Sequence, residues 1–483
     1  MIGSDTQLQI DKIWEMFWVG GIANPLTMIE QLIYLLFLKS LDEKQDVYDK
    51  EAEHRGTIPR QIFLETQQDF RWKHLKEMSE QEMFDVISHK IFPFLKTIHP
   101  NTDSAFSKYM KDALFLIPTP HMLAKIINSI DELNLESKDA KGDMYEYLLS
   151  TISQAGKNGQ FRTPRHIIDL MVHLIKPIPT DVICDPACGT GGFLVAASEY
   201  VKKEFPEIQN NVEILNHVNN HMFYGYDTDR TMLRIGAMNL MLHGIENPNI
   251  FYTNSLSEQN TDHEKYTVIF ANPPFKGILD HESIVPSLLE MTHTRKTEIL
   301  FLHVILRSLQ IGGRCAVIVP SGITTNETSM HHKLRKSLME DHQLEAVIEM
   351  PSGVFRPYTG ISTAILIFTK TGNGGTEHVW FYQMRSDGYS LDDKRIPIPQ
   401  NDIDDIKQRF SERKQEISRD RNDQSFLVHR DEIKEHQYIL SYDTYKNIVY
   451  KKTVYEKPAK ILEKIISIEK EIQSLIDEIK TKV

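Results

Sequence analysis

The residues best suited to chemistry are Asn272-Pro-Pro-Phe275, which follow an apolar stretch at residues 268–270. The two prolines stiffen the backbone and fix the direction of the Pro273 carbonyl. With the side-chain oxygen of Asn272, that carbonyl can accept both hydrogens of an exocyclic amino group. The nitrogen lone pair then conjugates less with the ring and can attack a methyl sulfonium, through positioning and charge stabilisation rather than a general base. Phe275 can stack on a base removed from the double helix.

A second cluster is the glycine-rich run Asp185-Pro-Ala-Cys-Gly-Thr-Gly-Gly-Phe193. Its glycines allow a tight turn and a close approach of the backbone to a ligand. The run is not the dinucleotide pattern G-x-G-x-x-G, because Leu194 takes the place of the third glycine, and no Gly-Lys-Ser/Thr of a phosphate loop follows. An acid just before the turn suits a ligand with an ammonium group, such as the methionine part of S-adenosylmethionine.

A third candidate is Asp227, at the end of the apolar stretch of residues 222–226. A carboxylate there can accept hydrogen bonds from both hydroxyls of a ribose. Asp227 follows Asp185 by 42 residues, which is longer than usual for such a pair. We therefore expect an insertion in the polar stretch of residues 204–220.

These residues need a scaffold of alternating strands and helices. Apolar stretches predict strands at residues 182–184, 222–226, 267–270, 315–319, 344–348 and 363–368, and helices at residues 193–202, 231–243 and 298–309. Thr163 and Pro164 suit the N-cap and first position of a further helix through Ile175. This alternation predicts an α/β fold with an open, doubly wound, mostly parallel sheet, whose ligands bind beyond the carboxyl ends of the strands.

Composition limits the possible function classes. The chain has 483 residues, enough for two or three domains, and 55 Lys and Arg against 67 Asp and Glu give a net charge of −12. An acidic balance argues against this chain making most phosphate contacts to DNA alone. No apolar run is long enough for a membrane span, and we expect no secretion signal. The three cysteines fit neither a disulfide framework nor a zinc site, so we expect no metal and a cytoplasmic location.

The two ends of the chain differ from its centre. Helical spacing predicts a helical domain at residues 1–155, with a helix start at Asn24-Pro25, before a catalytic domain at residues 156–400. Residues 401–483 form a predicted C-terminal helical tail. Its last segment carries apolar residues spaced by four and three, at Ile461, Ile465, Ile468, Ile472, Leu475 and Ile479. This helix either packs on its own domain or contacts another chain.

Together these motifs resemble the amino-group DNA methyltransferases and, more closely, the modification subunits of Type I restriction–modification systems, which methylate adenine at N6. The resemblance covers nearly the whole chain. It includes Phe17-Trp-Val-Gly-Gly21, Met350-Pro-Ser-Gly-Val-Phe355 and Asp387-Gly-Tyr-Ser-Leu-Asp-Asp-Lys-Arg395. It implies a class I S-adenosylmethionine-dependent methyltransferase fold and site-specific methylation that protects host DNA from restriction.

The resemblance also assigns site residues. It implies that Asn272, Pro273 and Phe275 hold the flipped adenine. It further implies that the cofactor is bound by Gly159, Gln160, Phe161, Arg162, Thr163, Pro164, Asp185, Gly189, Thr190, Gly191, Gly192, Asp227 and Asn254. The chain departs from the family at two positions: Asn254 stands where an acid is common, and Thr267 where Asp is common.

Other functions are weighed against this interpretation. A cytosine C5 methyltransferase needs a thiolate nucleophile, and no cysteine here lies in a suitable loop. A protein-glutamine or RNA methyltransferase could share the Asn-Pro-Pro-Phe motif, and a silent scaffold could share the fold. Little chain remains for a sequence-reading domain. The resemblance therefore implies DNA as substrate and, as partners, a specificity subunit, a second modification subunit and a restriction or translocase subunit.

Overall fold

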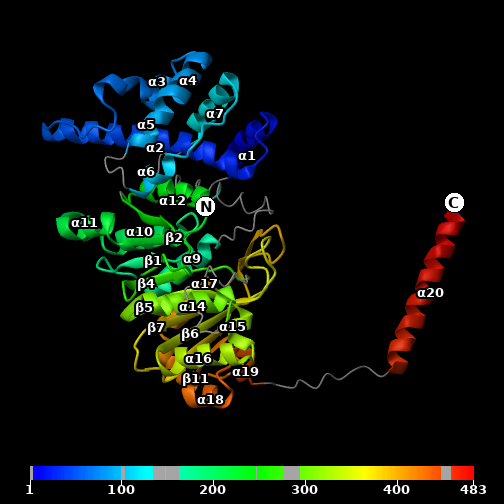
Figure 1. Cartoon of the computed structure of the whole chain (residues 1–483). Coiled ribbons are helices and arrows are strands. Elements are labelled where there is room, and N and C mark those ends of the chain that lie inside the picture. The colour runs from blue at the N-terminus through cyan, green and yellow to red at the C-terminus, as the bar shows by residue number, and fades with distance from the viewer. Residues whose placement is uncertain are drawn as a thin grey trace. The chain divides into compact units, whose positions relative to one another are not determined.

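The computed structural model describes residues 4–98, 104–133, 147, 163–245, 247–275, 294–447 and 458–482. The chain forms two compact units, Met1–Tyr445 and Lys446–Val483. The first unit holds the sheet and most of the helices (Figure 1).

A nine-stranded sheet is the centre of the first unit, with strand order β11-β8-β6-β7-β5-β4-β1-β2-β3. Strands β3, β2, β1, β4 and β5 run parallel to one another, whereas β7 is antiparallel to β5 and β6. The predicted mostly parallel, doubly wound α/β sheet is confirmed. The strands are β1 (Ile183–Asp185), β2 (Phe223–Asp227), β3 (Asn249–Tyr252), β4 (Tyr266–Ala271), β5 (Leu309–Pro320), β6 (Gln343–Met350), β7 (Thr363–Thr369), β8 (His378–Gln383) and β11 (Ser425–His429).

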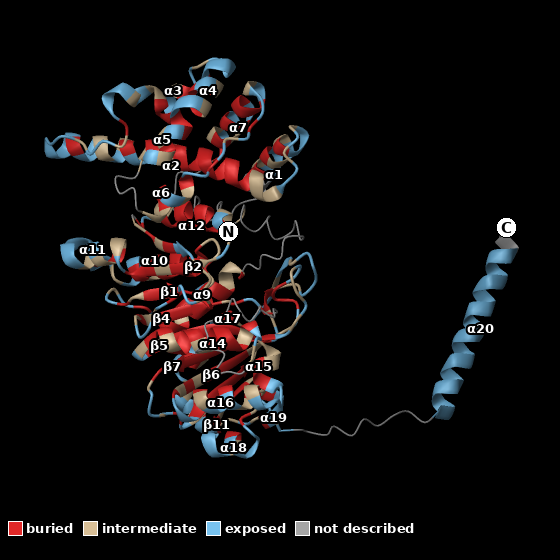
Figure 2. Ribbon diagram, viewed as in Figure 1, coloured by how far each residue is buried: buried red, intermediate tan, exposed pale blue. Residues whose placement is uncertain are grey.

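Helices cover both faces of this sheet. Successive strand residues point to opposite faces, so Phe270 of β4 joins the hydrophobic cluster under α9, α10 and α12, while Ile269 joins the cluster under α14 and α16. Buried residues follow this layering through the unit (Figure 2). The covering helices are α9 (Arg165–Ile175), α10 (Gly192–Glu204), α12 (Arg230–Leu242), α14 (Thr297–Ser308) and α16 (Ser329–Glu340). The expected insertion before β2 contains α11 (Val212–Asn220).

The N-terminal region is helical, as predicted. Its longest helix begins after Asn24, whose side chain accepts a hydrogen bond from the Leu26 amide at 2.9 Å. Residues 28–38 of this helix are all buried, so its neighbours surround it. The helices are α1 (Ser4–Val19), α2 (Pro25–Arg55), α3 (Trp72–Leu75), α4 (Glu80–Val86), α5 (Phe92–Thr97), α6 (Ala105–Met110) and α7 (Pro120–Glu132).

A buried ion pair joins this helical region to α12. Arg234 of α12 pairs with Glu30 of α2, and the Tyr34 hydroxyl donates to the same carboxylate at 2.7 Å. Arg234 Nε also donates to the Tyr109 carbonyl of α6 at 2.9 Å. Because both ions are buried, loss of either one would leave a charge without its partner. The helical region is therefore fixed to the helix that supports the glycine-rich turn.

The sheet continues beyond residue 400, because β11 pairs antiparallel with β8. A separate antiparallel pair precedes it, formed by β9 (Asp387–Tyr389) and β10 (Pro397–Asn401). The helices of this part are α17 (Ile403–Ser411), α18 (Arg430–Glu435) and α19 (Tyr442–Tyr445). The domain division at residues 155 and 400 remains a prediction.

The second unit contains the helix α20 (Pro458–Lys482), which confirms the predicted terminal helix. Its apolar side chains are 40–63% exposed. Leu462, Ile466 and Ile476 widen the predicted seam. Within the described part of the chain, no helix combines the length and apolarity needed to cross a membrane.

Candidate active site

The candidate site lies at the carboxyl ends of the parallel strands, where the strand order reverses. β1 has β2 on one side and β4 on the other, with Ile183 in register with both Phe223 and Val268. Asp185, Asp227 and Asn272 therefore follow or end three adjacent parallel strands. This is the topological switch point at which open α/β sheets bind ligands.

Asp185 supplies a buried acid at the end of β1. Its side chain accepts a hydrogen bond from the Ala187 amide at 3.0 Å, and the residue is only 2% exposed. Burial, aided by the neighbouring charge of Asp227 and opposed by the Ala187 hydrogen bond, raises the pKa of Asp185 to about 8. A cation beside Asp185 would stabilise its charged form. The buried carboxyl of Asp185 therefore favours binding of the ammonium group that the sequence predicts.

The glycine-rich turn after β1 is held in shape by α12 and Asp227. Gly189 and Gly191 have φ of 51° and 78°, a region that favours glycine. The Gly189 amide donates to Oδ2 of Asp227 at 2.8 Å. Asn239 of α12 donates from Nδ2 to the Thr190 carbonyl at 3.0 Å. Asn239 was not among the expected site residues, although a polar residue in the predicted helix of residues 231–243 was a signal.

Two further glycines allow this turn to lie close to its neighbours. A Cβ at Gly225 of β2 would lie 2.8 Å from Cys188 Sγ, and one at Gly236 of α12 would lie 3.1 Å from the Gly189 carbonyl oxygen. Gly192, the first residue of α10, is buried against Ile168. Larger side chains at Gly225 or Gly236 would displace the turn, so its position depends on residues outside the motif.

Asp227 has both carboxylate oxygens engaged with backbone amides. Oδ2 accepts from Gly189, and Oδ1 accepts from Asp229 at 2.9 Å. Burial is the main reason that the pKa of Asp227 lies above its ordinary value. Each oxygen has a second lone pair that can accept a further hydrogen bond. Ribose binding by Asp227 stays a prediction.

Asn254 lies just beyond β3, near the same edge of the sheet. Its side-chain oxygen accepts from the Leu256 amide at 3.0 Å, within its own turn. The next residue, Ser255, donates to the Pro186 carbonyl at 2.6 Å and so ties this turn to the glycine-rich motif. Cofactor contact by Asn254 remains a prediction.

Asn272 and Thr163 form the central polar contact of the site. Nδ2 of Asn272 donates to Oγ1 of Thr163 at 2.8 Å. Oδ1 of Asn272 is buried and has no hydrogen-bond partner among the described residues. An amide oxygen buried without a partner is costly, so it is ready to accept a hydrogen bond from a ligand. Oδ1 of Asn272 is the atom to which the sequence assigns the chemistry, and no described residue occupies it.

The expected role of Thr163 as a helix N-cap is wrong. Helix α9 begins at Arg165, its N-cap is Pro164, and no side chain caps it. The Thr163 hydroxyl is used for Asn272 instead, which a local capping rule cannot anticipate. Gly159, Gln160, Phe161 and Arg162 lie outside the described residues.

The aromatic residue of the motif packs on a second family-like segment. Phe275 is 5% exposed, and its ring lies edge-on to Phe355 with the centroids 5.6 Å apart. Pro273 is buried beside it. The structure therefore brings Met350-Pro-Ser-Gly-Val-Phe355 to the catalytic motif. Stacking of Phe275 on a base would require a face of its ring to be exposed.

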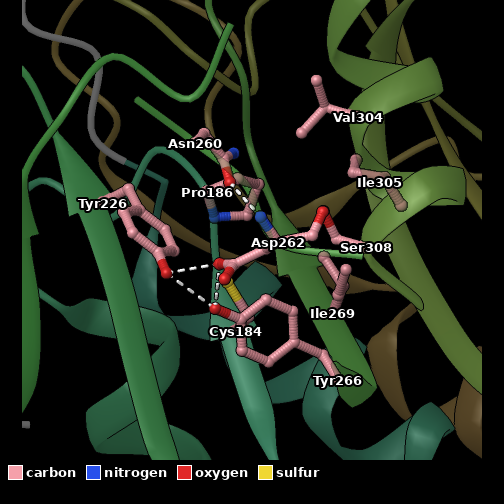
Figure 3. A pocket seen from close by; sticks show the side chains of 10 residues that line it. All are labelled: Cys184, Pro186, Tyr226, Asn260, Asp262, Tyr266, Ile269, Val304, Ile305 and Ser308. Atoms are coloured by element: carbon pink, nitrogen blue, oxygen red, sulfur yellow. Dashed lines mark hydrogen bonds between the residues drawn. The ribbon is translucent and has the colours of Figure 1, made fainter. Parts of the chain in front are cut away.

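A small cavity lies behind the turn, lined by strands β1, β2 and β4 and helix α14 (Figure 3). Its volume of about 10 Å³ has room for about one water molecule, which is too small for a cofactor. The hydroxyls of Tyr226 and Tyr266 point to the Asp262 carboxylate, and Tyr266 donates to it at 2.5 Å. Burial raises the pKa of Asp262, but these hydrogen bonds outweigh it and lower the pKa below its ordinary value. These hydrogen bonds connect Tyr226 of β2 and Tyr266 of β4 to the same carboxylate.

The fold and the site define the class of protein. The sheet order and the switch-point site are those of class I methyltransferases. Among the described residues, no group of three or more His, Cys, Asp or Glu is placed to hold a metal ion.

Comparisons with known proteins agree with this class. Residues 136–453 match the family model "N-6 DNA Methylase", and residues 6–130 match "HsdM N-terminal domain". The chain is 30% identical over 478 residues to the Type I restriction enzyme EcoEI methylase subunit of Escherichia coli, covering 95% of this chain and 94% of that one. It therefore belongs to the N-6 DNA methylase family, among the modification subunits of Type I restriction–modification systems.

Other relatives extend the comparison. The EcoKI methylase subunit of E. coli strain K12 is 27% identical over 438 residues, covering 85% of this chain and 77% of that one. A solved modification subunit assigned to a type I restriction enzyme from Vibrio vulnificus YJ016 shares the fold, with a TM-score of 0.73 and 23% identity, covering 89% of this chain and 92% of that one. A methyltransferase subunit from Streptococcus thermophilus has a TM-score of 0.69 at 18% identity, covering 92% of this chain and 100% of that one.

The close contact at Gly225 gives a testable expectation. Gly225→Ala should destabilise the protein by about 1–3 kcal/mol, because the new Cβ meets Cys188 Sγ. Adding Cys188→Ala should recover part of that loss, since it removes the clashing sulfur. Chemical denaturation followed by circular dichroism measures both. Losses that simply add in the double variant would show that the two residues are not coupled.

Proposed function

We propose that this methyltransferase subunit transfers the methyl group of S-adenosylmethionine to N6 of adenine at sites in duplex DNA, with Asn272 and Pro273 binding the target amino group. The observation that carries the proposal is the amide of Asn272. Its nitrogen is held by Thr163, and its buried oxygen has no partner among the described residues. The amide oxygen and the Pro273 carbonyl then accept the two amino hydrogens.

The residues around the glycine-rich turn fit this cofactor. Asp185 is an acid whose burial raises its pKa to about 8, and an ammonium group beside it would favour its charged form. The backbone at Gly189 and Gly191 lets a ligand approach closely, and Asp227 lies beside it. When bound, S-adenosylmethionine supplies an electrophilic methyl group. Thr190, Gly192, Asn254 and residues 159–164 complete the proposed cofactor contacts.

The chain's own residues act mainly by position and charge. As the target nitrogen forms its new bond it becomes more positive, and the oxygens of Asn272 and Pro273 stabilise that charge. Phe275, which packs on Phe355, would hold the base by stacking once a face of its ring is exposed. Formation of the N–C bond would break the methyl–sulfur bond of the cofactor and leave a thioether. The methylated nitrogen would then lose its extra proton to solvent, so none of these residues is assigned as a general base.

Cytosine C5 methylation is disfavoured by the state of the thiols. Cys184, Cys188 and Cys315 are buried and free, and burial holds the pKa of each thiol well above its ordinary value. A nucleophilic cysteine needs a lowered pKa. Free thiols also suit a reducing compartment, so the proposal includes a cytoplasmic location.

The proposed partners follow from charge and from α20. A net charge of −12 gives the chain little affinity of its own for phosphates, so a specificity subunit would supply target reading and most DNA contacts. The exposed apolar face of α20 would dock on that subunit or on a second modification subunit bound to it. A restriction or translocase subunit would join the same complex.

The raised pKa of Asp185 predicts that cofactor affinity depends on pH. Below pH 8 the carboxyl group is largely protonated, and binding of an ammonium favours its ionised form, so binding releases a proton. Affinity should rise from pH 6 to pH 8, by at most roughly tenfold per pH unit, and then level off. Calorimetry across this range measures it. Asp185→Asn should reduce the slope, and the exposed control Glu258→Gln should keep it; an unchanged slope in Asp185→Asn would refute the assignment.

The catalytic motif predicts that Asn272 and Phe275 separate by role. Asn272→Ala should reduce methyl transfer by about 100-fold or more, because it removes an oxygen that acts on the developing charge. Its binding of cofactor and DNA should persist. Phe275→Trp keeps a stacking face and should stay more active than Phe275→Ala, since stacking is worth about 1–3 kcal/mol. Transfer of labelled methyl to DNA measures all three; an active Asn272→Ala protein would overturn the proposal.

The apolar face of α20 predicts a role in assembly. Burial of one such side chain stabilises a contact by roughly 1.5–3 kcal/mol, so Ile468→Glu with Ile472→Glu should weaken complex formation. Glu463→Gln with Lys470→Gln, off the seam, is the matched control. Size-exclusion chromatography with the specificity subunit measures assembly, and calorimetry should show intact cofactor binding. Full assembly of the seam variant, or of a chain ending at Lys457, would show that the helix packs within its own chain.

A further inference from the structure

Asp387 is a fully buried acid that none of the steps above uses. Its Oδ2 accepts from Nε2 of His166 at 2.9 Å and from the guanidinium of Arg395. A carboxylate can only accept, so the imidazole nitrogen must be the donor. Burial raises the pKa of Asp387, but the hydrogen bonds from His166 and Arg395 outweigh it, and the pKa lies below its ordinary value. Asp387 is thus a fixed negative charge.

The backbone around Asp387 is held in an unusual shape. Gly388 has φ of 88°, and Arg395 has φ of 48° although it carries a side chain. Arg395 also donates from Nη1 to the Ser390 carbonyl at 2.9 Å. Such a conformation persists where surrounding contacts over-determine it, which is typical of functional segments. The segment therefore presents Asp387 rigidly.

His166 connects this segment to the start of α9. It lies in the first turn of that helix, and its ring stacks on Tyr389 with the centroids 4.7 Å apart and the planes 23° apart. The guanidinium of Arg395 lies 5.4 Å from the centroid of the same Tyr389 ring. The imidazole ring of His166 is thus held by stacking on Tyr389 and by its hydrogen bond to Asp387. Only two residues separate His166 from Thr163, whose hydroxyl holds Asn272.

We propose that Asp387 is a positioning residue for the catalytic amide. Through His166 it fixes the first turn of α9. That turn places the Thr163 hydroxyl where it accepts a hydrogen bond from Nδ2 of Asn272. Oδ1 of Asn272 then faces the target amino group. The inference rests on the proposed role of Asn272 and assigns a function to residues 387–395, which otherwise have none.

The hydroxyl of Thr163 is tested first, in the full chain assembled with its specificity subunit. Thr163→Val keeps the shape of the side chain and removes the acceptor. It should lower the single-turnover rate at saturating cofactor by about tenfold or more, because the amide is no longer oriented. Thr163→Ser keeps the hydroxyl and should restore the rate. The thermal midpoint should stay unchanged in both, and saturating cofactor keeps any effect of Thr163 on cofactor binding out of the measured rate.

The link through His166 is tested next. His166→Phe keeps a ring on Tyr389 and leaves Asp387 paired with Arg395, so it is milder than Asp387→Asn. Both should lower the single-turnover rate without changing KM for DNA. The double variant Thr163→Val, His166→Phe should be no slower than Thr163→Val alone, because both act on one path. Glu412→Gln, exposed and outside residues 387–395, is the control and should keep the rate.

Each outcome is decisive. If the losses of Thr163→Val and His166→Phe multiply, or if His166→Phe is fully active, Asp387 does not act through Thr163 and the inference is overturned. It is also overturned if Thr163→Val only weakens cofactor binding and regains its rate at saturation. Should Asp387→Asn not fold, His166→Phe decides. If Thr163→Val is fully active and Asn272→Ala is inactive, this inference is refuted and the proposed function stands. If Asn272→Ala is active, the proposed function is refuted.

Discussion

The hydrogen bond between Nδ2 of Asn272 and the Thr163 hydroxyl is the interaction on which the account depends. A primary amide has one donating and one accepting end, and only the accepting end can bind an amino hydrogen in the required direction. Occupying the nitrogen at 2.8 Å fixes which end faces the site. The rest of the structure can be understood as holding the two partners in place: β4 presents Asn272, and α9 with the segment of Asp387 presents Thr163. The oxygen that remains is buried without a described partner.

The parallel sheet was largely predictable because its strands are buried on both faces. Such strands are continuous apolar runs, which is why β1, β2, β4, β5, β6 and β7 were all expected. Strand β3 was missed, since Phe251 and Tyr252 are exposed and the run is short. Strand β8 was missed although residues 379–382 are an apolar and aromatic run of the kind that favours strands. Strand β11 was missed because it is a short run in a highly charged part of the chain.

The candidate site was predictable only in part, for a similar reason. Residue types and spacing identified Asp185, Asp227 and Asn272, because each follows or ends a recognisable strand. The contacts that shape the site come from elsewhere in the chain: Asn239 and Gly236 from α12, and His166 from α9. Thr163 was assigned to helix capping because its neighbours in sequence favour that role, yet its hydroxyl bonds to a residue 109 positions away. Long-range pairing of this kind depends on the fold and not on local propensity.

Binding of the adenine amino group by the Asn272 amide determines which base is methylated. The most direct measurement is the chemical identity of the methylated nucleoside, obtained by mass spectrometry of DNA after reaction with the assembled complex and a cofactor whose methyl group is isotopically labelled. The account predicts that the label appears in N6-methyladenine. Label in N4-methylcytosine, or in C5-methylcytosine, would contradict it.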